Sequence, residues 1–213
     1  MGIILLPFFI LALILLFDWV TFASENLGFS IMRVNLSGFD NSWYHPGPKW
    51  KIALWYLINI VFIQSRQPFS GLRLFWLKFF GANISGKVVI RPGVRVKYPW
   101  KLHISGPVWI GEDVWIDNLD TVRVDAHCCI SQGAMLLCGN HNYKTPHFDL
   151  ITGPIILEEG VWIGAKAVVC PGTVCRTHSI LSVGSVVSAE MLAFTIYRGN
   201  PAVPVRNREL PSQ

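Results

Sequence analysis

The chain has 213 residues, of which 52% are hydrophobic and 15% charged, and its formal net charge is +5. This length suits one domain with appendages and allows a sizeable core. The 18 lysines and arginines are scattered without a basic run, which argues against a nucleic-acid-binding protein. The cysteines have neither metal-ligand spacing nor an even number, so we expect small apolar fillers in a reducing compartment; they are Cys128, Cys129, Cys138, Cys170 and Cys175.

Residues 1–31 form an apolar N-terminal extension. The run Ile3–Phe17 is unbroken in its apolar character and ends at Asp18. It is shorter than the roughly 18 to 20 residues that span a bilayer, although Trp19–Ala23 could extend it. A signal peptide would begin with basic residues, which this segment lacks. We expect the natural start to be Met32, with a membrane segment as the alternative.

Two apolar helices are predicted in the region 32–83, at Ile52–Ile63 and Gly71–Phe80, with Pro68 between them. Their aromatic residues are interspersed with lysine and arginine, a composition that could form a basic amphipathic face for a membrane surface. A β-helix also needs a cover for the open edge of its first coil. We favour the capping role, and one surface could serve both purposes.

An apolar residue recurs every six positions along residues 84–192, which is typical of a left-handed parallel β-helix. The same period would place successive residues on opposite sides of an α-helix. Three hexapeptides make one coil, and a repeat of 20 residues in the first coils predicts an expanded corner near 98–102 and again near 118–121. The fold is therefore predicted to be dominated by β-structure, with helical segments at its N-terminal side and a C-terminal tail at 193–213.

Two files of side chains must point into the narrow core of this β-helix, because the positions four residues after the first file are also small or apolar. The first file is Ile84, Ile90, Val96, Ile104, Ile110, Ile116, Val124, Ile130, Leu136, Leu157, Ile163, Val169, Cys175, Leu181 and Val187. The second is Val88, Val94, Val108, Val114, Cys128, Ala134, Val161, Ala167, Thr173, Ser179 and Ser185.

The repeat is interrupted once, by a loop at 137–156 that contains Gly139-Asn140-His141-Asn142-Tyr143. An aliphatic core can perform no acid–base chemistry, so we expect such chemistry on a loop that a rigid scaffold holds. Histidine accepts a proton near neutral pH, and a positioned general base contributes roughly 10²- to 10⁴-fold in rate. His141 is therefore a candidate, although on residue type alone a surface histidine is the better interpretation.

Several motifs follow one another along the chain: Phe39–Gly47, Val114–Leu119, Ile130–Ala134, Gly139–Tyr143, Val161–Ala165 and Tyr197–Ala202. In this order they resemble the hexapeptide-repeat O-acetyltransferases, and most closely the colanic acid biosynthesis acetyltransferases, which are related to galactoside and maltose acetyltransferases. The resemblance covers about residues 35–208. It implies transfer of an acetyl group from acetyl-CoA to a sugar hydroxyl, in a homotrimer whose sites lie between neighbouring subunits.

The resemblance also implies roles for individual residues. His141 matches the family's general base, which deprotonates the acceptor hydroxyl, and Asn118 matches an asparagine that positions a hydroxyl or the histidine. The remaining matches line the path of the cofactor: Trp162, Gly164 and Ala165 beside the pantetheine arm, Val183 and Ser188 along the same groove, and Arg206 near the phosphates.

Two departures from the family pattern concern the cofactor phosphates. Ala189 stands where related enzymes often carry a lysine, and Val203 where some carry an arginine. Phosphate contacts must therefore be fewer, or come from Arg198 and Arg206. The loop around His141 is also shorter on its N-terminal side than in the galactoside enzymes, which leaves the acceptor unassigned.

The predicted function is thus an acetyl-CoA-dependent O-acetyltransferase of an exopolysaccharide or its precursor. It would work without a metal, in the cytoplasm or on the inner face of the membrane. One alternative is a zinc enzyme of the carbonic anhydrase type, for which His127, His141 and His147 would be the ligands. Another is a membrane-associated trimeric scaffold without catalytic activity.

Overall fold

The computed structural model describes residues 13–18 and 33–210 and divides into two compact units. The first unit comprises Met1–Phe39 and Tyr143–Phe148. Within it, residues 13–18 are helical and exposed, and η1 spans Leu36–Gly38. The predicted start at Met32 lies outside the described residues. None of the helices within those ranges is long and apolar enough to cross a bilayer.

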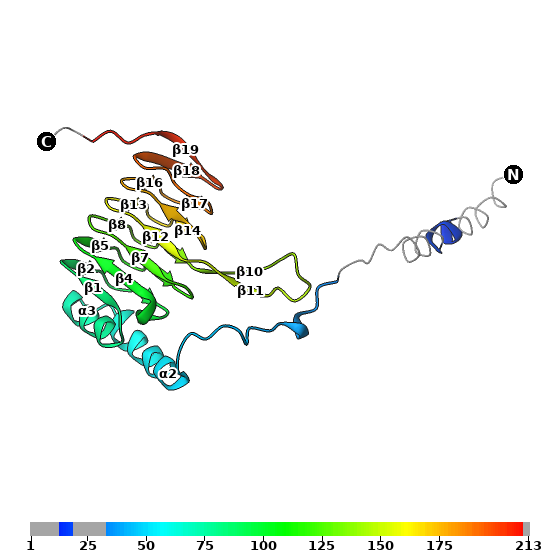
Figure 1. Cartoon of the computed structure of the whole chain (residues 1–213), viewed down its shortest axis with the longest axis horizontal. Helices are drawn as coiled ribbons and strands as arrows, with labels where there is room; N and C mark the ends of the chain where they lie inside the picture. Colours follow the sequence, from blue (N-terminus) through cyan, green and yellow to red (C-terminus); the bar gives the residue numbers. More distant parts are fainter. Residues whose placement is uncertain (1–12, 19–32, 211–213) are drawn as a thin grey trace. The chain divides into compact units, whose positions relative to one another are not determined.

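The second unit comprises Asp40–Asn142 and Asp149–Gln213 and contains a left-handed parallel β-helix, as predicted (Figure 1). The sheet that we call the first has the order β1-β4-β7-β12-β15, the second β19-β18-β16-β13-β8-β5-β2, and the third β17-β14-β9-β6-β3. Strands of the first sheet are β1 Asn83–Ser85, β4 Leu102–Ser105, β7 Val122–Val124, β12 Ile155–Leu157 and β15 Val174–Cys175. Those of the second are β2 Val88–Ile90, β5 Val108–Ile110, β8 Cys129–Ile130, β13 Trp162–Ile163, β16 Ile180–Leu181, β18 Thr195–Gly199 and β19 Ala202–Asn207. Those of the third are β3 Arg95–Val96, β6 Trp115–Asp117, β9 Met135–Leu137, β14 Val168–Val169 and β17 Val186–Val187.

The pairing register confirms the predicted coil lengths. His103 pairs with Asn83 below it and with Arg123 above it, a repeat of 20 residues in each case. Val174 pairs with Ile156, a repeat of 18, which is three hexapeptides without an expansion. The extra residues occupy the two predicted corners, and at the first of them η3 spans Pro99–Lys101.

The predicted inward files form the core. Every member of both files is buried, with exposed fractions between 0% and 8%. Three of the five free cysteines belong to this interior, and burial raises the pKa of Cys128, Cys138 and Cys175 to about 12. They are neutral thiols at physiological pH, which agrees with their predicted role as small apolar fillers.

Two helices cover the first coil. They are α2 Lys49–Ile58, which the π-helix η2 Asn59–Ile63 continues, and α3 Ser70–Phe79. Trp55, Ile63 and Leu77 are fully buried in one cluster with the lowest coil. The indole of Trp55 also donates to the carbonyl of Val96 at 2.9 Å. This packing is the capping arrangement that the sequence favoured, and α2 begins three residues before the predicted position.

The last residues continue the stack rather than forming an irregular tail. Strand β18 pairs in parallel with β16, and β19 returns antiparallel to β18. The reversal falls at Asn200 and Pro201, within the motif Tyr197–Ala202. The region 193–207 thereby closes one end of the second sheet.

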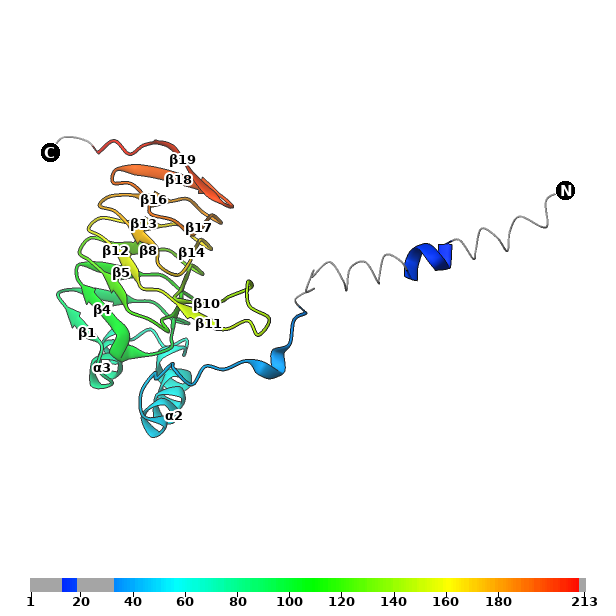
Figure 2. The same cartoon turned by 45° about the vertical axis from the view of Figure 1, so that its right-hand side comes forward.

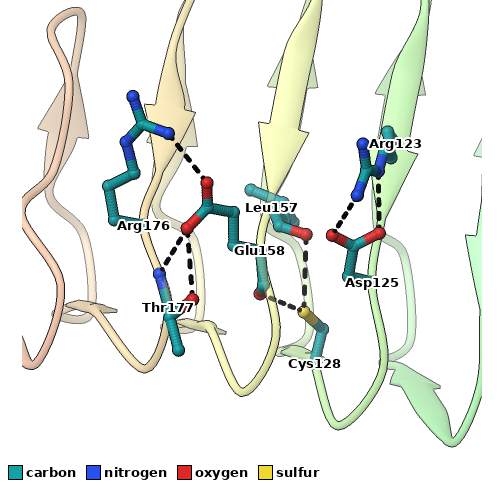
Figure 3. Close-up of polar contacts among 7 residues, drawn as sticks. All are labelled: Arg123, Asp125, Cys128, Leu157, Glu158, Arg176 and Thr177. Atoms are coloured by element: carbon teal, nitrogen blue, oxygen red, sulfur yellow. Dashed lines mark hydrogen bonds and ion pairs between the residues drawn. The ribbon is translucent and has the colours of Figure 1, made fainter.

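A polar cluster ties the coils together at one edge of the first sheet (Figure 3). The Glu158 carboxylate accepts hydrogen bonds from Arg176 Nη1 at 2.9 Å, from the Thr177 amide at 2.9 Å and from the Thr177 hydroxyl at 3.2 Å. Burial alone would raise the pKa of Glu158, but the hydrogen bonds from Arg176 and Thr177 outweigh it and hold the pKa below its ordinary value. The ionised carboxylate is therefore the form that stabilises the stack.

Replacing Glu158 with alanine should lower the free energy of unfolding by about 1–2 kcal/mol at pH 7, since a charged acceptor for a backbone amide is lost. Because the pKa is depressed in the folded state, the contribution is present above the ordinary glutamate pKa of about 4.3 and is lost as the pH falls below it. Denaturant unfolding at pH 7 and at pH 3 measures this difference. The neighbouring exposed Glu159→Ala variant is the control, with an expected change within about 0.5 kcal/mol; equal effects of the two variants would contradict the assignment.

Candidate active site

The predicted loop is a β-hairpin that leaves the stack between β9 and β12 (Figure 2). Its strands are β10 Gly139–His141 and β11 Leu150–Thr152, in which His141 pairs with Leu150. At its base the Gly153 amide donates to the Cys138 carbonyl at 2.9 Å, and Cys138 is fully buried. The coil then resumes, with Ile155 paired to Val122.

His141 is exposed at the end of β10, three residues from the buried Cys138. Its backbone amide donates to the side-chain oxygen of Asn140 at 2.8 Å, and the Asn142 amide closes the ladder on the Asp149 carbonyl at 2.8 Å. The hairpin thus presents an imidazole to solvent while the core fixes its base. A side chain in this position can exchange a proton with a bound molecule.

A contact that the sequence did not predict holds the base of the hairpin from below. The side chain of Leu119 packs directly beside Gly139, since a Cβ on Gly139 would lie 2.8 Å from Leu119 Cδ1. The Leu119 carbonyl in turn accepts hydrogen bonds from the Tyr44 hydroxyl, at 2.6 Å, and from the Lys101 ammonium. Desolvation raises the pKa of Tyr44, so its hydroxyl keeps its proton. Tyr44 and Leu119 lie 75 positions apart, so no local pattern could predict this contact. The motif Phe39–Gly47 was its only signal in the sequence.

Asn118 has a different environment from the one expected of a residue at an acceptor site. Its side chain is fully buried, with an exposed fraction of 0%. The amide oxygen accepts from the Tyr98 backbone at 2.9 Å, and the amide nitrogen donates to the Tyr98 carbonyl at 2.6 Å. Asn118 therefore joins the two expanded corners to each other, and leaves no surface for a direct contact with a hydroxyl. The predicted role of Asn118 in positioning a hydroxyl or the histidine stays a prediction.

Two of the predicted cofactor residues line one groove. Trp162 and Arg206 lie together in a cavity of about 650 Å³ on the second sheet, with Ile180, Ile196, Asn207, Arg208 and Glu209. The Trp162 indole donates to the Ser131 hydroxyl at 2.9 Å, which fixes the ring against the sheet. Arg208 is anchored by bonds from Nη1 to the carbonyls of Gly160 and His178, at 2.8 and 3.1 Å. The groove therefore has an apolar floor, and its polar residues include the two arginines Arg206 and Arg208 and one carboxylate, Glu209.

The other predicted cofactor residues lie at corners of the stack. Gly164, Ala165 and Val183 meet at the edge between the second and third sheets, where Gly164 donates to the Leu181 carbonyl at 2.7 Å and Gly184 to the Ala165 carbonyl at 2.9 Å. Val183 is 71% exposed. Ser188 is exposed after β17, at the edge between the third and first sheets, from which the hairpin also emerges.

The three-histidine zinc alternative is not assembled. No group of three or more His, Cys, Asp or Glu side chains that could hold a metal ion occurs within residues 13–18 and 33–210. His127 occupies a corner with a positive φ of 61°, and His147 contacts the Asn35 carbonyl through Nδ1 at 2.7 Å.

The described residues thus form a β-helix of hexapeptides with an exposed histidine on an inserted hairpin. No family model matches the chain. The chain is 35% identical over 176 residues to WcaF of Escherichia coli K12, a protein named for acetyl transfer in colanic acid biosynthesis, and the match covers 82% of this chain and 97% of WcaF. The chain therefore belongs to the hexapeptide-repeat acetyltransferase family, in the colanic acid acetyltransferase branch.

More distant relatives share the fold. The galactoside O-acetyltransferase of E. coli K12 is 23% identical over 133 residues, which is 61% of this chain and 66% of that enzyme. A structure of galactoside acetyltransferase in complex with coenzyme A superposes with a TM-score of 0.68 at 20% identity, over 75% of this chain and 82% of the other. The hexapeptide-repeat acetyltransferase VCA0836 of Vibrio cholerae gives 0.66 at 19% identity, over 76% and 92%.

Gly164→Ala should weaken both the stack and the groove beside it. An added Cβ would lie 2.6 Å from the Val183 amide nitrogen and 2.7 Å from the Leu181 carbonyl oxygen, so the backbone of the next coil must move. We expect a loss of about 2–4 kcal/mol in the free energy of unfolding, as for overpacking against backbone. Thermal and denaturant unfolding measure it.

Gly71→Ala is the matched control for this variant. Gly71 lies in α3 with nothing within 4 Å of an added Cβ, and alanine favours a helix over glycine by about 1 kcal/mol. Unchanged or raised stability is expected there, and a Gly164→Ala protein as stable as the original would refute the close approach of the coils.

Proposed function

We propose that the protein transfers the acetyl group of acetyl-CoA to a sugar hydroxyl of an exopolysaccharide or its precursor, with His141 as general base. Membership of the acetyltransferase family supports the reaction class. Acetyl-CoA is the expected donor because related proteins were solved with coenzyme A or acetyl-CoA. The galactoside enzyme among the relatives supports a sugar acceptor.

One observation carries the proposal: the histidine and the groove lie on different sides of the same triangular stack. The hairpin leaves the edge between the third and first sheets, whereas Trp162 and Arg206 lie on the second sheet, which faces away from that edge. One copy of the chain cannot bring the two together. The site would become complete when the His141 hairpin of one copy meets the groove of another. This geometry supports sites between subunits, and the family resemblance supports a homotrimer as the proposed assembly.

The outer surface of the second sheet suits such an assembly. Its outward positions pair in register as an apolar ladder: Val89, Trp109, Cys129, Trp162, Ile180 and Ile196. The side chain of Trp109 is 66% exposed. A contiguous apolar strip of this kind on a flat sheet is typical of a surface that another chain covers. Trp162, Ile180 and Ile196 belong both to this strip and to the groove, so a second chain that covers the strip would also exclude water from the thioester.

The proposed reaction needs no group beyond the residues described and the donor. The His141 imidazole takes the proton of the acceptor hydroxyl while the oxygen attacks the thioester carbonyl carbon. The carbon–sulfur bond then breaks, and the imidazolium returns the proton to the coenzyme A thiolate. Backbone amides near the hairpin would stabilise the oxyanion, and binding in the groove supplies proximity.

The proposal gives each cofactor residue a part. Trp162, Ile180 and Ile196 offer apolar contact to the pantetheine arm, and Arg206 on the rim binds phosphate oxygens, for which guanidinium is well suited. Gly164 and Ala165 allow the arm close to the backbone, and Val183 borders its path at the same edge. Ser188 lies at the hairpin edge instead, so it would reach the cofactor only in the site that it shares with a neighbouring copy. Asn118 acts at a distance by fixing the corner below the hairpin.

His141→Ala should abolish acetyl transfer, with a loss of about 10²- to 10⁴-fold in kcat, and leave the affinity for acetyl-CoA unchanged. His103→Ala is the control, since His103 is an exposed histidine on β4 of the first sheet. Product formation from a panel of sugar acceptors and binding by calorimetry give the two readouts. Undiminished transfer by His141→Ala would remove the histidine from the mechanism.

Arg206→Ala should weaken acetyl-CoA binding about tenfold, because one charged hydrogen bond to phosphate is lost. Calorimetric titration measures it, and the exposed Arg123→Ala variant on the first sheet should bind as the original does. Saturable binding at one site per chain favours the enzyme over the non-catalytic scaffold. A folded trimer that fails to bind acetyl-CoA would favour the scaffold.

A further inference from the structure

An uncovered apolar stripe runs along α2 and η2, on the side away from the β-helix. Trp50, Leu54, Leu57, Ile60 and Val61 are 70%, 44%, 59%, 61% and 45% exposed. Their spacing of three and four residues puts them on one helical face, while Trp55, Asn59 and Ile63 face the first coil. The buried side already satisfies the capping role, so this stripe has no function within the β-helix.

Helix α3 and the residue before it add an aromatic patch at the same end of the stack (Figure 1). Phe69, Phe75 and Phe79 are 67%, 56% and 68% exposed. The rings of Phe75 and Phe79 stack with centroids 6.1 Å apart, and each of them also contacts Trp76. We call the eight residues the cap surface: Trp50, Leu54, Leu57, Ile60, Val61, Phe69, Phe75 and Phe79.

The helices of the cap surface carry basic residues and no acidic ones, although three basic residues of the wider region pair with carboxylates of the coils, as Arg66–Asp113, Arg91–Glu112 and Lys97–Asp117. The sequence contains no acidic residue between Asp40 and Glu112. The same stretch carries ten basic residues: Lys49, Lys51, Arg66, Arg73, Lys78, Lys87, Arg91, Arg95, Lys97 and Lys101. Lys49 and Lys78 are exposed on the two helices, whereas Arg66 pairs with Asp113 at 3.3 Å and Arg73 is buried. Exposed aromatic and aliphatic groups beside lysines fit the interface of an anionic bilayer, which offers hydrocarbon and negative headgroups at one depth.

We propose that the cap surface docks the enzyme on an anionic lipid bilayer, with α2, η2 and α3 lying in the plane of the interface. The short helices cannot span the hydrocarbon, but an apolar face of this kind needs to be buried only to the depth of the headgroup boundary. Lysines at its rim gain roughly 1 kcal/mol each near such a surface. A second copy of the chain would gain nothing from this charge, because two identical basic caps repel each other.

Docking fixes the height of the proposed active site, and this step rests on the proposed function. Strand β3, which contacts η2, is followed in its sheet by β6 and then β9, where the hairpin begins. With roughly 4.8 Å between neighbouring strands, the base of the hairpin lies about 10 Å along the stack from the first strand of that sheet. The acceptor class is therefore a saccharide carried on a membrane lipid, whose sugar stands just above the headgroups.

Sedimentation of the full chain with vesicles tests the docking. Wild-type protein should bind vesicles of phosphatidylglycerol and phosphatidylethanolamine, bind less as salt rises, and bind weakly to pure phosphatidylcholine. The triple variant Leu57→Ser, Ile60→Ser and Phe75→Ser should lose at least about tenfold in binding, since three exposed apolar groups no longer enter the interface. The triple variant Leu192→Ser, Val203→Ser and Leu210→Ser, which changes exposed apolar residues outside the cap surface, should bind as wild type.

A cap variant that stays folded and binds vesicles as tightly as wild type would overturn the proposal, and would assign binding to the apolar run Ile3–Phe17. A cap variant of smaller oligomeric size would overturn it in favour of a contact between copies. Calorimetry with acetyl-CoA, without vesicles, separates this proposal from the proposed function. Vesicle binding without acetyl-CoA binding supports docking and removes the lipid-linked acceptor, whereas acetyl-CoA binding without vesicle binding overturns docking alone.

Discussion

Stacking of the coils in register is the constraint on which every other feature of the β-helix depends. Each strand pairs with the strands directly below and above it, so the backbone groups of one coil are satisfied by the next. At some corners the distance between coils then leaves no room for a side chain. A Cβ on Gly111 or Gly164 would come within 2.6 Å of a backbone nitrogen in the coil above. The side chains of the inward files can differ in size along the stack, but the spacing between the backbones of neighbouring coils is fixed.

The hairpin satisfies this constraint by leaving the stack before its register is disturbed. Its base closes between Cys138 and Gly153, and the coil that continues pairs Ile155 with Val122 as if nothing had been inserted. Polar residues can therefore be placed on the hairpin without burying them in the core, where an unpaired polar group costs about 1–3 kcal/mol. The proposed chemistry and the stability of the stack are thereby assigned to separate segments, which meet where Leu119 packs beside Gly139.

The sequence predicted what the period of six determines and little of what long-range contacts determine. The inward files, the two expanded corners and the position of the interruption follow from spacing alone, and all three are found. The residues of the hairpin show no alternation of apolar and polar side chains that would have predicted the pairing of His141 with Leu150. The residues of β18 and β19 were predicted only as part of a C-terminal tail. Their strands lack the inward period, because β19 runs antiparallel to the coils.

The candidate site was predicted by its residues but not by its arrangement. Spacing does not show that Trp162 and Arg206, 44 positions apart, share one groove, or that Asn118 is buried against Tyr98. These facts depend on which coil lies above which, and on the last strand folding back over β18. The resemblance to a family supplied the expected roles of the residues. The structure adds on which sheet or edge each residue lies, and therefore which of them one chain can bring together.

Assembly and docking place related demands on the same geometry. If the hairpin of one copy completes the groove of the next, the copies must stand side by side in a closed ring, since each hairpin and each groove can serve only one neighbour. In the proposed homotrimer this ring has three members. A rotation axis parallel to the stacks keeps all three caps at one end. Three weak cap surfaces then meet the bilayer together, and linked binding events raise the overall affinity far above that of each alone. A cap with only modest apolar area could in this way hold an enzyme at the membrane, and the same three-fold arrangement would set each histidine at one height above the lipid.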